Sequence, residues 1–124
     1  MAVRKSARFR NGIDGILVSN HGARSEDSGR ATIDVLPEVV EAVKGRATVI
    51  VDSGFRRGTD IAKAMAMGAQ AVGVGRPYLW GLGAFGEPGV AKALEILRTE
   101  FQVAMAQSGI RSVKEFTPAF VRKV

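Results

Sequence analysis

Two short apolar segments, each followed directly by glycine and arginine, constrain the fold of this 124-residue chain more than any other feature. Residues 48–51 and 71–74 are rich in β-branched side chains and have the length of buried strands. Residues 60–67 between them have the composition of a helix, with Thr59 placed to cap its start and Gly68 to end it. The sequence therefore predicts two parallel strands joined by a crossover helix.

The glycines and arginines after these predicted strands indicate an anion site. In a parallel sheet the carboxyl ends of neighbouring strands meet at one edge, where α/β proteins bind ligands. Glycine lets backbone amides approach a ligand closely, and an arginine guanidinium offers a planar fork of donors. Arg56 follows the first strand and Arg76 follows the second, so we expect a phosphate group to bind beside them.

A further apolar segment, residues 13–19, precedes this unit and predicts another strand. It leads into Asn20-His21-Gly22-Ala23-Arg24. A histidine just after a strand, with a glycine behind it and an arginine three residues on, suits a site better than a core. Residues 33–43 then carry apolar side chains at helical spacing, and we assign that helix a packing role only.

Residues 78–86 are rich in aromatic residues and glycine. A short helix packed under a loop is the favoured interpretation, and a wall of a cofactor site is the alternative. A longer amphipathic helix follows from Glu87, and Gly109 ends it.

This alternation of strands and helices predicts an α/β fold with a parallel sheet. Because so small a sheet leaves both edges unpaired, we expect the chain to be a section of something larger.

Composition excludes several other classes of protein. The sequence has no cysteine, which excludes a disulfide framework, and it predicts no metal site. Its net charge of +6 comes without a nucleic-acid-binding motif, so we expect no nucleic-acid partner. The sharpest basic cluster falls in residues 1–11, predicted as an N-terminal segment apart from the domain at 12–124. Neither a signal peptide nor an apolar run of membrane-spanning length is apparent, so we expect a cytoplasmic location.

Residues 19–24 (SNHGAR), 52–60 (DSGFRRGTD) and 75–77 (GRP) occur in this order along the chain. Together they resemble the FMN-dependent 2-hydroxy acid dehydrogenases and oxidases, a family that includes glycolate oxidase, lactate oxidase, mandelate dehydrogenase and flavocytochrome b2. The resemblance covers nearly the whole chain from Asn11 onward. It implies that the chain is the C-terminal section, about three β/α units, of a (β/α)8 TIM barrel. Its strands would be the sixth, seventh and eighth of that barrel.

The resemblance also implies roles for individual residues. His21 resembles the base that takes a proton from the substrate as hydride equivalents pass to the flavin, and Arg24 resembles the arginine that binds the substrate carboxylate. The other matches imply contacts with FMN: Ser19 near the polar edge of the flavin ring, Asp52 at the ribityl chain, and Ser53, Gly54, Arg56, Gly75 and Arg76 around the phosphate. These residue types suit the chemistry, since carboxylates and phosphates favour bidentate cations and imidazole has an ordinary pKa near working pH.

Some positions depart from the family's usual pattern. Ser53 stands where a second glycine is frequent, as it does in members similar to mandelate dehydrogenase. Residues 25–26 replace the usual Gln-Leu, which leaves the identity of the 2-hydroxy acid open. The family's catalytic tyrosines and its flavin-facing lysine would lie before Met1. We therefore expect a fragment, inactive alone, that contributes to oxidation of a small L-2-hydroxy acid when joined by the N-terminal part of the barrel or in a homo-oligomer.

Two alternatives stay open. One is a phosphate-binding barrel of different chemistry, because many barrels share a cradle of glycine and arginine at strand ends. The motif Asn20-His21-Gly22-x-Arg24 argues against it. The other is a catalytically silent module that self-associates or pairs with an N-terminal partner chain.

Overall fold

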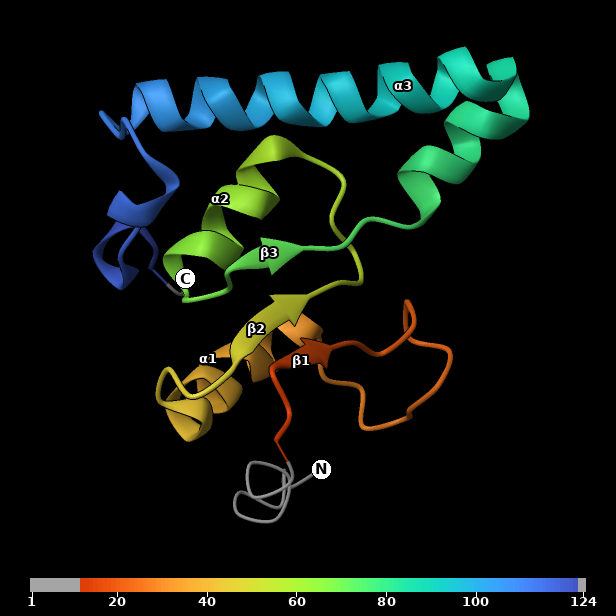
Figure 1. Cartoon of the computed structure of the whole chain (residues 1–124). Coiled ribbons are helices and arrows are strands. Elements are labelled where there is room, and N and C mark those ends of the chain that lie inside the picture. The colour runs from red at the N-terminus through yellow and green to blue at the C-terminus, as the bar shows by residue number, and fades with distance from the viewer. Residues whose placement is uncertain (1–11, 123–124) are drawn as a thin grey trace.

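A parallel three-stranded sheet with helices against it forms the framework of the protein (Figure 1). The computed structural model describes residues 12–122. Strands β1 (Gly15–Val18), β2 (Thr48–Val51) and β3 (Ala71–Val72) lie in the order β1-β2-β3. The predicted α/β class is therefore confirmed. The predicted basic segment 1–11 lies outside the described residues.

The strands are shorter than the sequence suggests. β1 begins at Gly15 instead of residue 13, and β3 ends at Val72 instead of residue 74. The early end of β3 follows from its partner, because β2 turns away at Ser53, which has a φ of 76°. Beyond Val72 only one further ladder bond forms, from the backbone N–H of Gly73 to the carbonyl of Val51 at 2.8 Å.

Helices α1 (Thr32–Val43) and α2 (Gly58–Ala66) pack on one face of the sheet. Side chains alternate between the faces of a strand, so Val49 and Val51 are buried under the helices while Thr48 is exposed on the other face. The core on the helical side consists of apolar residues from the strands, helices and their connections: Val18, Leu36, Val39, Val43, Ala47, Val49, Val51, Phe55, Ala64 and Ala69.

The opposite face of the sheet is bare within residues 12–122. Leu17 lies there with 57% of its surface exposed, beside its register partner Ile50, which is half-buried. Ala71, the partner of Ile50 on β3, is exposed as well. The three strands thus present an apolar row that none of the described helices covers.

The start of α2 differs from the prediction. Thr59 is the second residue of the helix and not its cap. The side chain of Asp60 instead reaches back over the preceding loop, where its Oδ2 accepts hydrogen bonds from the backbone N–H groups of Arg56 (3.1 Å) and Arg57 (3.0 Å). A carboxylate in the first helical turn is also favoured by the helix dipole. Gly68 follows the helix with a φ of 100°, as expected for a residue that ends it.

Helix α3 (Arg76–Gln107) consists of two limbs that meet at Gly86, where φ is 65° and ψ is −144°. The first limb confirms the short helix predicted for residues 78–86, and the second begins where the long helix was expected. The limbs approach each other at Gly81 and Gly89, where a Cβ on either residue would collide with the other's carbonyl. Two short 3-10 turns follow, η2 (Val113–Glu115) and η3 (Pro118–Phe120).

None of the helices formed by residues 12–122 combines the length and the apolar character needed to cross a membrane.

Helices α2 and α3 come together at Gly58. A Cβ at this position would run into the backbone of Glu100 and Phe101. The carboxylate of Glu100 accepts hydrogen bonds from the Gly58 N–H at 2.8 Å and from Nε of Arg57 at 3.1 Å. The two helices are therefore joined by a close backbone approach and by a shared acceptor.

Replacing Gly58 with alanine is expected to lower the free energy of unfolding by roughly 1–3 kcal/mol, because the methyl group must push the two helices apart. Gly83→Ala is the matched control, since Gly83 is also helical but faces open space. Alanine there should raise the free energy of unfolding by roughly 0.5–1 kcal/mol through helix propensity. Urea unfolding followed by circular dichroism measures both, and equal stabilities of the two variants would contradict the close approach.

Candidate functional site

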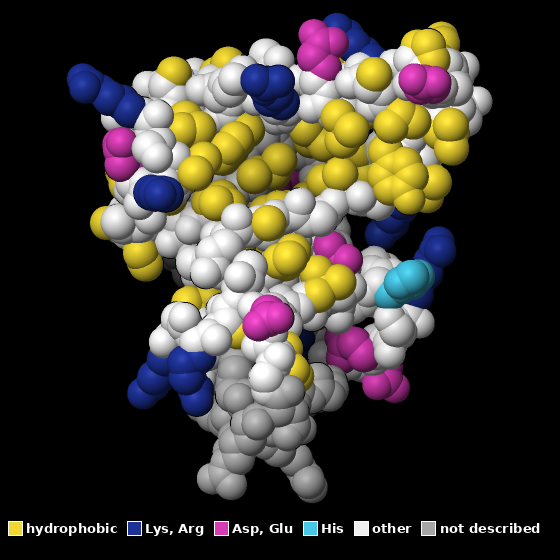
Figure 2. Space-filling view, in the orientation of Figure 1, with side chains coloured by type: hydrophobic (Ala, Val, Ile, Leu, Met, Phe, Trp, Pro, Cys, Tyr) yellow, Lys and Arg dark blue, Asp and Glu magenta, His cyan; other side chains and the backbone are white. Residues whose placement is uncertain are grey.

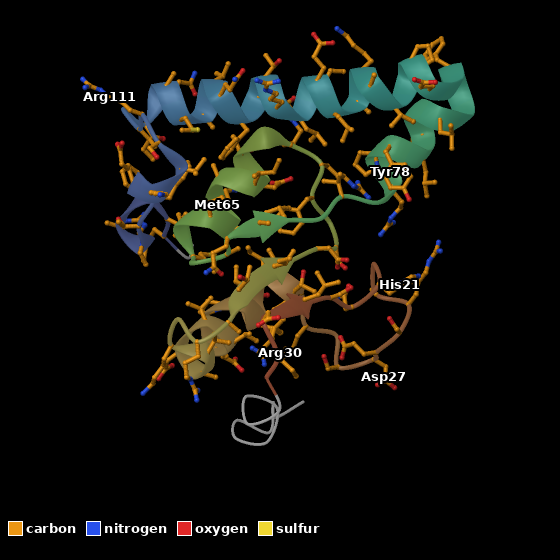
Figure 3. All side chains as sticks on the ribbon, viewed as in Figure 1. His21, Asp27, Arg30, Met65, Tyr78 and Arg111 are labelled. Atoms are coloured by element: carbon orange, nitrogen blue, oxygen red, sulfur yellow. The ribbon has the colours of Figure 1, made fainter. Side chains whose placement is uncertain are left out.

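A cavity of about 310 Å³ lies among the segments that follow the three strands. Its walls come from the turn after β1, from residues 52–56 after β2 and from residues 73–79 after β3. This volume lies at the lower end of the range for small-molecule sites. Figure 3 shows His21 and Tyr78 on the same side of the molecule, one from the turn after β1 and one from the start of α3.

The cavity brings together nearly all the site residues predicted from the sequence. Those that line it are His21, Arg24, Asp52, Ser53, Gly54, Arg56, Gly75 and Arg76. Ser19 is the exception, because it is absent from the lining, and its Oγ accepts a hydrogen bond from the backbone N–H of His21 at 3.1 Å. In this structure Ser19 shapes the turn that carries the histidine.

That turn has an uncommon backbone. His21, Gly22 and Ala23 have φ values of 54°, 68° and 68°, three successive residues in the left-handed region. Only glycine adopts this region without strain, so the turn needs hydrogen bonds to hold it. Asn20 supplies three: its carbonyl accepts from the N–H groups of Arg24 at 3.1 Å and Ser25 at 3.4 Å, and its Oδ1 accepts from the N–H of Ala23 at 2.9 Å. The turn places the imidazole of His21 at the surface (Figure 2).

The end of β2 is held by a residue that the sequence analysis missed. Thr32, the first residue of α1, is buried, and its Oγ1 donates a hydrogen bond to the carbonyl of Asp52 at 2.6 Å. The helix predicted over residues 33–43 thus begins one residue earlier than expected, and this additional residue makes a structural hydrogen bond to the end of β2. Hydroxyl residues are common at helix starts, so no pattern in the sequence connects Thr32 with a residue twenty positions away.

Of two adjacent arginines, only one faces the cavity. Arg57 forms an ion pair with Glu100 of α3 at 3.1 Å. The guanidinium carbon of Arg56 lies 5.6 Å from the centroid of the Trp80 ring, within reach of a cation–π contact, and Arg56 lines the cavity. Trp80 belongs to the segment for which a cofactor wall was the alternative prediction, and Tyr78 from the same helical limb also lines the cavity. The segment is therefore helical and forms part of the cavity wall, while a contact with a cofactor stays a prediction.

Arg76, a further arginine of the cavity lining, reaches from the start of α3 to the turn after β1. A Cβ at Gly22 would lie 2.7 Å from Nη2 of Arg76, so the guanidinium group passes close to this glycine and would have to shift to admit a side chain there. Neither Arg56 nor Arg76 forms an ion pair with a carboxylate of residues 12–122. The three arginines that line the cavity, Arg24, Arg56 and Arg76, thus form no ion pair in the part of the chain that the structure describes.

Hydrogen bonds and charge order the polar loop between the turn and α1. The hydroxyl and the backbone N–H of Ser28 lower the pKa of Glu26 by hydrogen bonding to its carboxylate. The Glu38 carboxylate raises the pKa of Arg30 through a hydrogen-bonded ion pair. Both groups are solvent-exposed, so these interactions add little stability. Their effect is to shape the wall of a neighbouring hollow that contains Glu26, Arg30 and Arg76.

The donors of the cavity suit an anionic ligand such as a phosphate group. Arg56, Arg76 and the amides at the start of α3 provide positive charge and N–H donors for an anion. A Cβ at Gly54 or Gly75 would meet no protein atom, so the backbone at both positions is open to a ligand. Asp52 also lines the cavity, and its carboxylate can accept hydrogen bonds.

Residues 5–123 match the family model of FMN-dependent dehydrogenases. The chain is 59% identical over 114 residues to 2-hydroxyacid oxidase 1 of Mus musculus, covering 92% of this chain and 31% of that protein. It is 49% identical over 110 residues to L-lactate oxidase of Nostoc sp., covering 89% and 30%. A solved mandelate oxidase variant with a monooxide FMN adduct matches at 47% identity and a TM-score of 0.82, over 86% of this chain and 34% of that one. The chain thus spans about a third of the length of these relatives.

Thr32→Val is expected to lower the free energy of unfolding by roughly 1–3 kcal/mol, because valine keeps the shape of threonine but leaves the Asp52 carbonyl without this donor. Thr99→Val is the control, since Thr99 is an exposed residue of α3 and its substitution should change stability by less than about 0.5 kcal/mol. Chemical denaturation of both variants measures the difference, and equal effects would exclude a structural role for the Thr32 hydroxyl.

Proposed function

Because the chain belongs to the FMN-dependent dehydrogenase family, we propose that it forms the FMN phosphate site and the proton-accepting end of an enzyme that oxidises a small L-2-hydroxy acid to the 2-oxo acid. The observation that carries this proposal is the single cavity in which His21, Arg24, Asp52, Arg56 and Arg76 meet. The names of two matched relatives, 2-hydroxyacid oxidase and L-lactate oxidase, denote the same chemistry. They do not favour the alternative of a phosphate-binding barrel with another reaction.

The cofactor would lie along the strand ends with its phosphate beside α3. Arg56 and Arg76 would bind the phosphate oxygens, and the open backbone at Gly54 and Gly75, next to Ser53, would add N–H donors. The Asp52 carboxylate would accept hydrogen bonds from the ribityl hydroxyls. The contact of Ser19 with the flavin ring stays a prediction. When bound, FMN supplies the hydride-accepting chemistry.

The turn after β1 would act on the substrate. The guanidinium of Arg24 is suited to bind the substrate carboxylate through two hydrogen bonds. A ring nitrogen of His21, three residues away along the turn, would accept a proton from the same substrate molecule. Because both side chains come from one short turn, substrate binding and proton transfer would be positioned together.

We also propose that the three strands are the sixth to eighth of a (β/α)8 barrel and that residues 12–124 form this partial domain. Parallel order, helices on one face and a site at the carboxyl ends of the strands are features of such a barrel. Its other strands would pair at the free edges of β1 and β3 and cover the bare face at Leu17. These strands would come from the N-terminal part of the barrel. Alternatively, a second copy of the chain in a homo-oligomer would cover the free edges and the bare face. The cytoplasmic location stays a prediction.

The phosphate site can be tested by titrating the chain with FMN and following flavin fluorescence. Arg56→Ala and Arg76→Ala should each weaken FMN binding by roughly 10–100-fold, because each removes charge-assisted hydrogen bonds to the phosphate. Arg57→Ala is the matched control, since its guanidinium pairs with Glu100, and it should change FMN affinity by less than about threefold. Riboflavin, which lacks the phosphate, should bind equally to all four proteins.

The control decides what a loss of affinity means. An equal loss in Arg57→Ala would show that general positive charge, and not the two cavity arginines, binds the phosphate. Failure of the folded wild-type chain to bind FMN at any concentration tested would overturn an independent cofactor site in these residues.

The isolated chain is expected to show no turnover of L-lactate with FMN and a dye as electron acceptor, because residues on the other side of the flavin would come from the remaining β/α units. Adding a separately produced N-terminal part of a relative's barrel should restore dye reduction. Substantial dye reduction by the chain alone, above that of free FMN, would contradict this division of the site.

A further inference from the structure

One side chain, that of Ser53, connects the turn carrying His21 to the end of β2. Its Oγ accepts a hydrogen bond from the backbone N–H of Gly22 at 3.1 Å and donates one to Oδ1 of Asp52 at 2.8 Å. The first bond joins residues 31 positions apart. Within the described part of the chain, the other hydrogen bonds of the turn stay inside it or reach only the loop before α1.

Serine is an unusual residue for this backbone. Ser53 has a φ of 76° and is followed by Gly54 with a φ of 88°, so both lie in the region that favours glycine. A residue with a side chain persists in such a conformation when its surroundings hold it there. The two hydrogen bonds of the Ser53 hydroxyl do this. The shape of the turn would favour glycine at position 53, and the two hydrogen bonds of the hydroxyl are what serine adds there.

The acceptor at the far end of this connection is itself firmly placed. The backbone N–H of Asp52 donates to the Val18 carbonyl at 3.1 Å, and its carbonyl accepts from Thr32 at 2.6 Å. A Cβ at Gly73 would lie 3.0 Å from the Cβ of Asp52, so the backbone that follows β3 also lies close to Asp52. A fixed Asp52 orients the Ser53 proton, which leaves the lone pairs of Oγ to accept from Gly22.

From this geometry we infer that Ser53 is a positioning residue for His21. The inference rests on the proposed function, in which His21 is the base. The path runs from the Gly22 N–H through the Ser53 hydroxyl to Oδ1 of Asp52, and it sets where the neighbouring imidazole stands relative to the strand ends. Oδ2 of Asp52 is left over for the ribityl chain in the proposed complex, so one carboxylate would serve both the cofactor and the turn.

The test measures hydrogen exchange of the Gly22 amide by NMR in the full chain. In Ser53→Ala, exchange at Gly22 should become roughly tenfold faster, as expected for the loss of one neutral hydrogen bond. Ser53→Gly should do the same while keeping the fold, because glycine adopts a φ near 76° without strain. The Ala23 amide, which donates to Asn20, and the amides of α1 should keep their wild-type rates.

A second readout comes from the histidine itself. His21 is the only histidine in the sequence, so its ring signals in a proton–carbon spectrum are unambiguous. They should shift or broaden in both Ser53 variants. Ser28→Ala removes an exposed hydroxyl from the nearby loop and should leave both the ring signals and the Gly22 exchange rate unchanged.

Two results would overturn the inference. One is an unchanged Gly22 exchange rate in both Ser53 variants. The other is an increase shared equally by the amides of α1, which would indicate general destabilisation. Neither measurement needs FMN or substrate, so a failure of the chain to bind FMN would count against the proposed function alone.

Discussion

Asp52 is the residue on which the sheet and the candidate site both depend. Its backbone continues the ladder to β1 through Val18 and accepts a hydrogen bond from Thr32 at the start of α1. Its side chain packs against Gly73 after β3 and accepts from Ser53. One residue thus joins the ends of all three strands and one helix. Because the three strands end side by side, the segments that follow them can line the same cavity.

Two neighbouring arginines, Arg56 and Arg57, have different partners because they lie at different positions before α2. Arg57 immediately precedes α2, so its side chain reaches α3 and pairs with Glu100, which also accepts from Gly58. Arg56, one residue earlier, points instead to the cavity and lies over Trp80. An aromatic partner holds a guanidinium without neutralising it, whereas a carboxylate removes its net charge. Only the first arrangement leaves a cation available for a phosphate.

The parts of the structure that depend on local pattern could be predicted from the sequence. Strand length, β-branched content and glycine spacing placed β2 correctly, and the motifs around His21, Asp52 and Arg76 indicated the family. Details set by distant partners could not be predicted. The contact of Thr32 with Asp52 and that of Trp80 with Arg56 join segments that only the folded chain brings together. The residue type of Thr59 favours a cap, but Asp60 is the residue whose carboxylate reaches the preceding amides.

The strand order β1-β2-β3 is also the order in which the chain is synthesised. When β2 and β3 leave the ribosome, each therefore finds a partner already made, and the connections that close between them are those around α1 and α2. Domains fold from the N-terminus during synthesis, and short-range contacts form quickly. Arg76 and the first limb of α3 emerge after these three strands. Assembly during translation would thus build the three-stranded scaffold first and add Arg76 to the cavity last.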